Sequence, residues 1–70
     1  MDKTVYLFIS NRGNRAMLNY SMSAGMWLIQ VEERFNDVFV TVYHSSRKTL
    51  ASAVEAVHTK YPNELWEEFK

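Results

Sequence analysis

The sequence predicts an α+β domain: a small antiparallel sheet of three to four strands, one amphipathic helix packed across it, and a short C-terminal helical tail. Three observations support this prediction. Apolar residues recur with period two in several segments up to residue 44, the period lengthens to about 3.6 after residue 46, and turn-forming residues separate the segments. The chain has 70 residues and no repeat or linker, so we assign residues 1–70 to a single domain.

Residues 4–10, TVYLFIS, form the first predicted strand. Its side chains are apolar on both faces, which favours a central position in the sheet. The segment that follows, SNRGNRA, contains Asn11, Gly13 and Asn14, which tolerate positive φ and predict a turn. Residues 16–22 have a mixed pattern and predict a weaker strand at the edge of the sheet.

Residues 26–44 predict an antiparallel hairpin. The first strand alternates in period two over residues 26–34, and Asn36 and Asp37 supply the turn. The returning strand, DVFVTVYH at residues 37–44, carries apolar side chains on both of its sides. The apolar side chains on both sides of such a strand need to be buried against another element or another chain.

A helix is predicted from Ser46 onward, because Leu50, Val54, Val57 and Tyr61 recur at helical spacing. Ser46 or Thr49 is the expected N-cap, and Pro62 is expected to end the helix. Beyond Pro62, the segment NELWEEFK predicts one or two further helical turns.

A single helix covers only one face of a sheet, so the apolar residues of the opposite face need another cover. We assign nine residues to the helix-covered face: Val5, Leu7, Ile9, Trp27, Ile29, Val31, Val38, Val40 and Val42. The opposite face then carries the predicted partner-binding residues, which are Tyr6, Phe8, Leu28, Phe39 and Tyr43. Three alternatives could bury this opposite face: the tail folded beneath the sheet, a second copy of the chain as a homodimer, or a different protein.

The composition narrows the classes of function. Eight basic residues balance eight acidic ones, so the overall charge does not steer the chain toward nucleic acid or an anionic membrane. The absence of cysteine excludes disulfides and thiolate metal sites. The apolar run Val5–Ile9 is too short for a signal peptide or a membrane span, so we expect a cytoplasmic location and no membrane contact.

No combination of residues predicts catalysis, a cofactor or a metal site. The segment from Ser45 to Lys48 fits the pattern S-x-x-K, but a serine nucleophile of that type needs a large cleft, and helix capping explains the serines better. His44 and His58, with Asp37 or Glu55, lack the local spacing of metal ligands. We therefore predict a protein that is not an enzyme.

The sequence favours binding over chemistry. We predict a small protein-binding module, in the format of the phage or mobile-element proteins that inhibit a larger host enzyme or a defence complex, anti-CRISPR proteins included. The alternative is a single-stranded nucleic-acid-binding protein, in which bases stack on the sheet aromatics. Four arginines are the candidate contacts to phosphate or to an acidic partner: Arg12, Arg15, Arg34 and Arg47.

Overall fold

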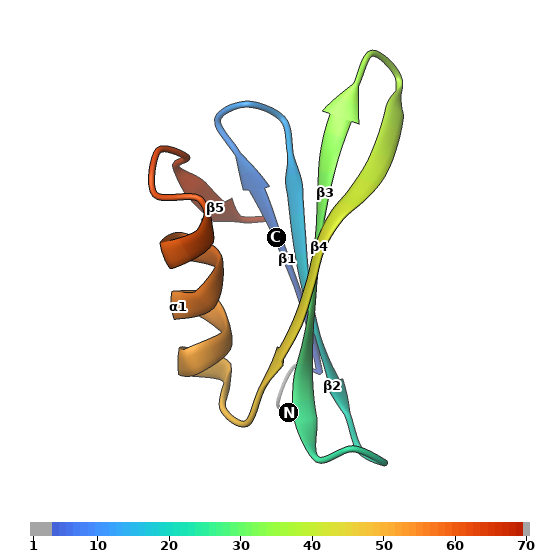
Figure 1. The fold of residues 1–70 in the computed structure, drawn as a ribbon, viewed down its shortest axis with the longest axis vertical. Coiled ribbons are helices and arrows are strands. Elements are labelled where there is room, and N and C mark those ends of the chain that lie inside the picture. Colours follow the sequence, from blue (N-terminus) through green and yellow to red (C-terminus); the bar gives the residue numbers. More distant parts are fainter. Residues whose placement is uncertain (1–3, 70) are drawn as a thin grey trace.

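The computed structural model describes residues 4–69, which form one antiparallel sheet and one helix (Figure 1). The elements follow the order β1 (Val5–Ser10), β2 (Arg15–Ser21), β3 (Met26–Phe35), β4 (Val38–Arg47), α1 (Leu50–Lys60) and β5 (Trp66–Glu68). The five strands lie in the order β4-β3-β2-β1-β5, and every neighbouring pair is antiparallel. The predicted α+β class, with an antiparallel sheet and one long helix, is confirmed.

Residues with positive φ make the three turns that connect β1 to β4. Gly13 has φ 81° between β1 and β2, Gly25 has φ 64° between β2 and β3, and Asn36 has φ 58° between β3 and β4. Glycine and asparagine adopt this left-handed region at the lowest steric cost. The turn residues that the sequence marks therefore do connect successive strands.

The helix also forms as predicted. The Thr49 hydroxyl accepts a hydrogen bond from the Ser52 backbone N–H at 3.1 Å, so Thr49 is the N-cap. Ala53 and Val57 are buried against the sheet, and the predicted stripe packs around them. Helical residues end at Lys60, before Tyr61 and Pro62, as expected for a proline that cannot continue the hydrogen-bond ladder.

The predicted strand number, the edge position of the second strand and the helical tail are wrong, because the sheet has five strands rather than three to four. Residues 15–21 form β2, an interior strand between β1 and β3 rather than an edge. The tail forms the fifth strand rather than helical turns: β5 pairs with β1, and the Phe69 N–H donates to the Leu7 carbonyl at 2.8 Å. So short a helix is costly to nucleate. The edge of β1, in contrast, has backbone N–H and C=O groups with which the tail can form strand hydrogen bonds.

A buried polar contact fixes the path of the chain into β5. The Asn14 side chain donates to the Glu64 carboxylate at 2.9 Å and accepts from the Arg34 N–H at 3.0 Å. Both Asn14 and Glu64 are buried, although they lie fifty residues apart in the sequence. Beside this contact the Asn11 side chain accepts from the Leu65 N–H at 3.0 Å, which ties the β1–β2 turn to the start of β5.

The strand register determines which side chains face the helix. Tyr6 and Phe8 lie opposite Leu18 and Ala16, which belong to the buried core, whereas Leu7 lies opposite Met17 on the other face. The predicted facing of β1 is therefore wrong: Val5, Leu7 and Ile9 point away from the helix. Because β1 is apolar on both sides, its own alternation does not distinguish the two faces.

The valines of β4 are also not covered as predicted. Val38, Val40 and Val42 are 61%, 45% and 42% exposed. The eleven residues of α1 extend about 16 Å, whereas the ten residues of β4 extend about 33 Å. The end of the β3–β4 hairpin therefore projects beyond the helix (Figure 1).

Candidate functional site

The candidate site is the face of the sheet that points away from α1, which we call the open face. Alternation and register place on it side chains from all five strands and from the residue after β5. Within residues 4–69, the only helix lies on the opposite side, against β2, β3 and β4. The open face comprises Val5, Leu7, Ile9, Arg15, Met17, Asn19, Leu28, Gln30, Glu32, Arg34, Phe39, Thr41, His44, Ser46, Glu67 and Phe69.

One half of the open face is apolar. Val5, Leu28 and Phe69 are 55%, 42% and 65% exposed, and Leu7, Ile9 and Met17 are half-buried between them. Two shallow hollows lie on this half. One is lined by Val5, Met17, Asn19, Leu28, Gln30 and His44.

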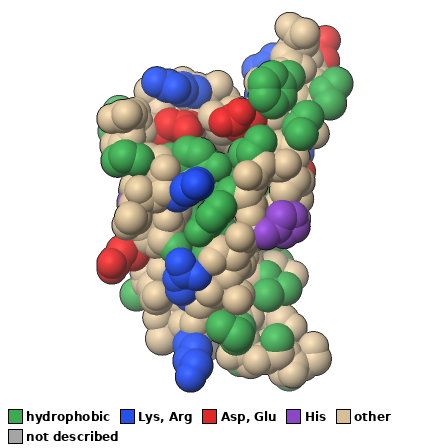
Figure 2. Space-filling model, viewed as in Figure 1, with side chains coloured by type: hydrophobic (Ala, Val, Ile, Leu, Met, Phe, Trp, Pro, Cys, Tyr) green, Lys and Arg blue, Asp and Glu red, His purple; other side chains and the backbone are tan. Residues whose placement is uncertain are grey.

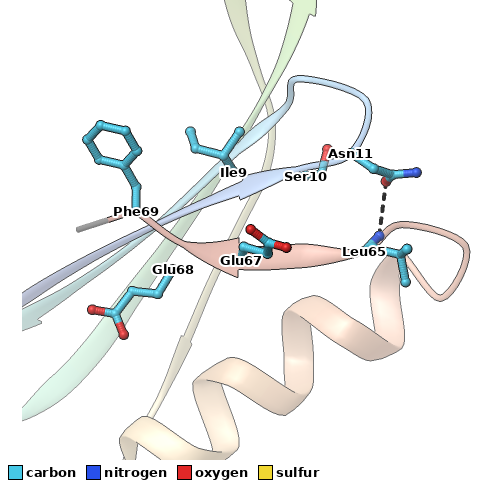
Figure 3. Close-up of a pocket in the computed structure, with 7 residues that line it drawn as sticks. All are labelled: Ile9, Ser10, Asn11, Leu65, Glu67, Glu68 and Phe69. Atoms are coloured by element: carbon cyan, nitrogen blue, oxygen red, sulfur yellow. Dashed lines mark hydrogen bonds between the residues drawn. The ribbon is translucent and has the colours of Figure 1, made fainter.

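The second hollow lies where β5 joins β1 (Figure 3). Ile9 and Phe69 project to the side away from the helix, whereas Glu68 points to the helix side. Leu65 and Glu67 also line this hollow, so an apolar floor is bordered by one carboxylate on the open face. The tail therefore extends the apolar half rather than covering it.

The other half of the open face is polar and ordered. The Arg15 guanidinium donates to one Glu32 oxygen from Nε at 2.9 Å and from Nη2 at 2.6 Å. The Gln30 amide donates to the second Glu32 oxygen at 3.3 Å and to the Thr41 hydroxyl at 3.1 Å. The guanidinium also lies 3.6 Å from the centre of the Phe39 ring, a cation–π contact.

Of the five predicted partner-binding residues, two lie on the open face and three do not. Leu28 and Phe39 are on it, but Tyr6, Phe8 and Tyr43 pack against the core on the helix side. The Tyr6 ring lies 5.8 Å from that of Trp27, and the Tyr43 ring lies 6.3 Å from that of Tyr61. The predicted partner-binding residues are therefore divided between the two faces. The register of β1 with β2, and a bulge in β4 where Val31 pairs with Tyr43 and Glu32 with Thr41, reverse the facing predicted for them.

The covered side has a distinct electrostatic feature at Tyr61. Burial raises the pKa of the Tyr61 hydroxyl above its ordinary value, and the nearby Glu33 and Glu64 carboxylates and Tyr43 add to this effect. The neutral hydroxyl is thus favoured in the folded chain. The Tyr61 ring also contacts that of Trp66 at 6.1 Å, so the last strand contributes to the core through this side.

The four candidate arginines occupy separate environments. Arg15 is paired with Glu32, and Arg34 donates to the Asn36 carbonyl at 2.8 Å in the β3–β4 hairpin. Arg47 donates to the Ser45 hydroxyl and to the Ser46 carbonyl at the end of β4, and Arg12 is exposed in the β1–β2 turn. Arg15 and Arg34 lie on the open face, Arg34 opposite Phe39, and the carboxylates of Glu32 and Glu67 on the same face balance their charge.

The two histidines lie on opposite sides of the sheet. His44 is on the open face of β4, whereas His58 is exposed on α1. Within residues 4–69, no three side chains of His, Cys, Asp or Glu gather in a way that could hold a metal ion. In the same range, no helix combines the length and apolar character needed to cross a bilayer.

No known protein family, curated protein or solved structure matches this chain. Sequence reasoning missed the open-face residues Val5, Leu7, Ile9, Met17 and Phe69. A signal was present in β2, where Ala16 and Leu18 alternate with Arg15, Met17 and Asn19 and so indicate which side is buried.

Proposed function

We propose that this chain is a non-enzymatic protein-binding module whose partner protein packs on the open face of the sheet. The observation that carries the proposal is the uncovered apolar half of that face, formed by Val5, Leu7, Ile9, Met17, Leu28 and Phe69. Contiguous apolar surface on a small domain is typical of an interaction site. The ordered polar half beside it would fix the orientation of the partner.

Comparing the free energy of burying the exposed apolar side chains with that of a micromolar complex indicates how much of the open face a partner has to contact. Covering the remaining exposed parts of Val5, Leu28 and Phe69 contributes on the order of 3 to 5 kcal/mol. A micromolar complex requires about 8 kcal/mol net of the cost of association. Three anchors alone are therefore insufficient, and the partner would also have to contact the half-buried residues and the hydrogen-bonded network of Arg15, Glu32 and Gln30.

A protein partner fits the face better than single-stranded nucleic acid. Base stacking requires accessible aromatic faces, but Tyr6, Phe8 and Tyr43 pack on the helix side and the Phe39 ring is already in contact with Arg15. Phosphate binding requires unbalanced positive charge, but Arg15 is paired with Glu32, and the two open-face arginines, Arg15 and Arg34, are matched by the two carboxylates Glu32 and Glu67.

The setting we propose is the cytoplasm, with a larger host enzyme or defence complex as the target that the module inhibits. This part of the proposal is supported by the format of the chain, which is small, free of cysteine and without a predicted catalytic constellation. The open face would then act by occupying a surface of the target.

Site-specific photo-crosslinking tests the proposal. A photoreactive residue at Leu28 should trap a partner protein from a lysate of the source cells, and the same residue at Ala51, exposed on α1, should not. The captured protein is then purified for titration with V5K and L28K, which place a charge on the apolar half, and with the control A51K.

We expect V5K and L28K each to weaken binding by at least about tenfold, whereas A51K binds as the unmodified chain does. Raising the salt concentration should change the affinity little, because the interface is mostly apolar. Unchanged binding by V5K and L28K would refute the open face as the docking site. Capture of nucleic acid, with a steep loss of affinity in salt, would favour the alternative function.

A further inference from the structure

The two edges of the sheet differ in how they are protected. The β5 edge has three residues, of which two are the glutamates Glu67 and Glu68. The β4 edge has ten residues, and no charged side chain occurs from Val38 to Ser46. Short strands, charges and bulges discourage pairing with another chain. The β4 edge has one bulge, at Val42, and uncharged segments on either side of it. Within residues 4–69, β3 is the only strand that pairs with β4.

In the half of β4 near the hairpin turn, the valine side chains are also exposed to solvent. Val38 and Val40 are exposed because the hairpin projects beyond α1, and Val42 is exposed at the bulge. Figure 2 shows hydrophobic side chains gathered on this projecting hairpin. On this half of β4 the backbone edge and its apolar side chains are thus accessible in the same place, whereas the other half, from Tyr43 onward, lies beside α1.

The charges at the two ends of β4 are complementary to each other. Asp37 immediately precedes the strand, while Arg47 ends it and Lys48 follows. Arg47 is held there by the Ser45 hydroxyl and the Ser46 carbonyl. If β4 lies antiparallel to β4 of a second copy, the acidic start of each strand meets the basic end of the other, so the favourable pairing occurs twice. A parallel arrangement would place like charges together.

We infer that the occupant of the β4 edge is a second copy of this chain, paired antiparallel about a two-fold axis near Val42. Val42 lies midway between Asp37 and Arg47 and is the extra residue of a bulge, since Val31 pairs with Tyr43 and Glu32 with Thr41. The two-fold axis brings the bulges of the two strands to the same level, so the ladder hydrogen bonds between the copies form on either side of Val42. The uncharged segments from Val38 to Ser46 then lie along each other.

This pairing has a structural consequence for the open face. The two five-stranded sheets join into one continuous sheet, with both helices on one side and both open faces on the other. A chain of only 70 residues, which buries a limited share of its surface by itself, gains burial from the added strand contact. The inference rests on the edge and holds whether or not the open face binds a protein.

Oppositely charged substitutions at Val42 test the inference. We expect the unmodified chain to sediment as a dimer at micromolar concentration, and V42K and V42E alone each to weaken dimerisation by about tenfold or more, because like charges meet at the axis. An equimolar mixture of V42K and V42E should recover the dimer. V5K, a charge on an exposed strand valine of the open face, should leave the dimer intact.

Disulfide trapping locates the contact. The chain contains no cysteine, so V42C should give a covalent dimer on mild oxidation while V5C stays monomeric on a denaturing gel. The inference is overturned if the unmodified chain is monomeric at 100-fold higher concentration, if the V42K and V42E mixture stays monomeric, or if V5C alone cross-links. Circular dichroism of each variant shows that the fold persists, as expected for substitution of an exposed side chain.

Discussion

The two faces of the sheet use the same strands and differ in almost every other respect. On the helix side Ala16, Leu18, Ile29 and Val31 are buried, and half-buried aromatic rings pack around them. On the open face the neighbouring residues of the same strands form one half with exposed apolar side chains and another half with a hydrogen-bonded polar network. One helix of eleven residues accounts for this difference.

The apolar character of a residue alone therefore does not show that it belongs to the core of a small sheet. Leu18 on β2 is fully buried, and Leu28 on the adjacent strand β3 is 42% exposed, although both are leucines in the middle of the sheet. They differ in facing, because Leu18 lies on the helix side and Leu28 on the open face. Substitutions at matched positions on the two faces therefore test the account directly.

The largest difference is expected for these two leucines. Leu18→Ala removes a fully buried side chain and leaves a cavity, so the free energy of unfolding should fall by about 3 kcal/mol. Leu28→Ala should lower it by about 1 kcal/mol or less, because much of that side chain is already in water. Urea denaturation measures both, and equal losses would mean that the open face is covered in the isolated chain.

Two phenylalanines give the next largest contrast. Phe8 packs against the core between the sheet and α1, and Phe8→Ala should cost about 2 to 3 kcal/mol of stability. Phe39→Ala should cost about 1 kcal/mol and leave the chain folded, since that ring contacts Arg15 on the open face. Thermal unfolding followed by circular dichroism compares them. A larger loss for Phe39 than for Phe8 would contradict the facing derived from the register.

The polar half of the open face should contribute modestly to stability. Arg15 is about one third exposed, so its pair with Glu32 is partly screened by solvent. A double-mutant cycle with Arg15→Ala and Glu32→Gln should give a coupling energy of about 1 kcal/mol or less. A coupling energy several times larger would show that this pair holds the fold together rather than orienting a partner.

The smallest effect is expected at alkaline pH on the covered face. Burial raises the pKa of Tyr61 above 10.0, so its contribution to stability is fully present below pH 10 and is lost as the pH rises through the folded-state pKa. Tyr61→Phe should lose less stability than the unmodified chain over that alkaline range. The free energy of unfolding, measured in urea at a series of pH values, shows the difference, and parallel curves would contradict it.

The sequence predicted the fold where its signals are local. The N-cap Thr49, the stop at Pro62 and the turn at Asn36 each depend on a few neighbouring residues, and all three are present in the structure. The facing of β1 depends on its pairing with β2, which is a long-range property. Because β1 is apolar on both sides, local alternation placed Tyr6 and Phe8 on the wrong face.

Two further differences between the predicted and the observed fold also arise from long-range contacts between strands. The bulge at Val42 changes the alternation within β4, so Phe39 and Tyr43 lie on opposite faces although they are four residues apart. The tail forms β5 because the edge of β1 is available and because Asn14 meets Glu64, a contact across fifty residues. The existence of an uncovered face was predictable from the single helix, but the residues that form it required the register.

The most direct test of the account is the solvent accessibility of methyl groups in the isolated chain, measured by NMR with a soluble paramagnetic probe. The account predicts strong line broadening for the methyl groups of Val5 and Leu28 and little for those of Leu18 and Val31. Dimerisation through β4 would leave this result unchanged, because the open face stays uncovered. Equal protection of Leu28 and Leu18 would show that the open face is buried, and the proposed docking surface would then be excluded.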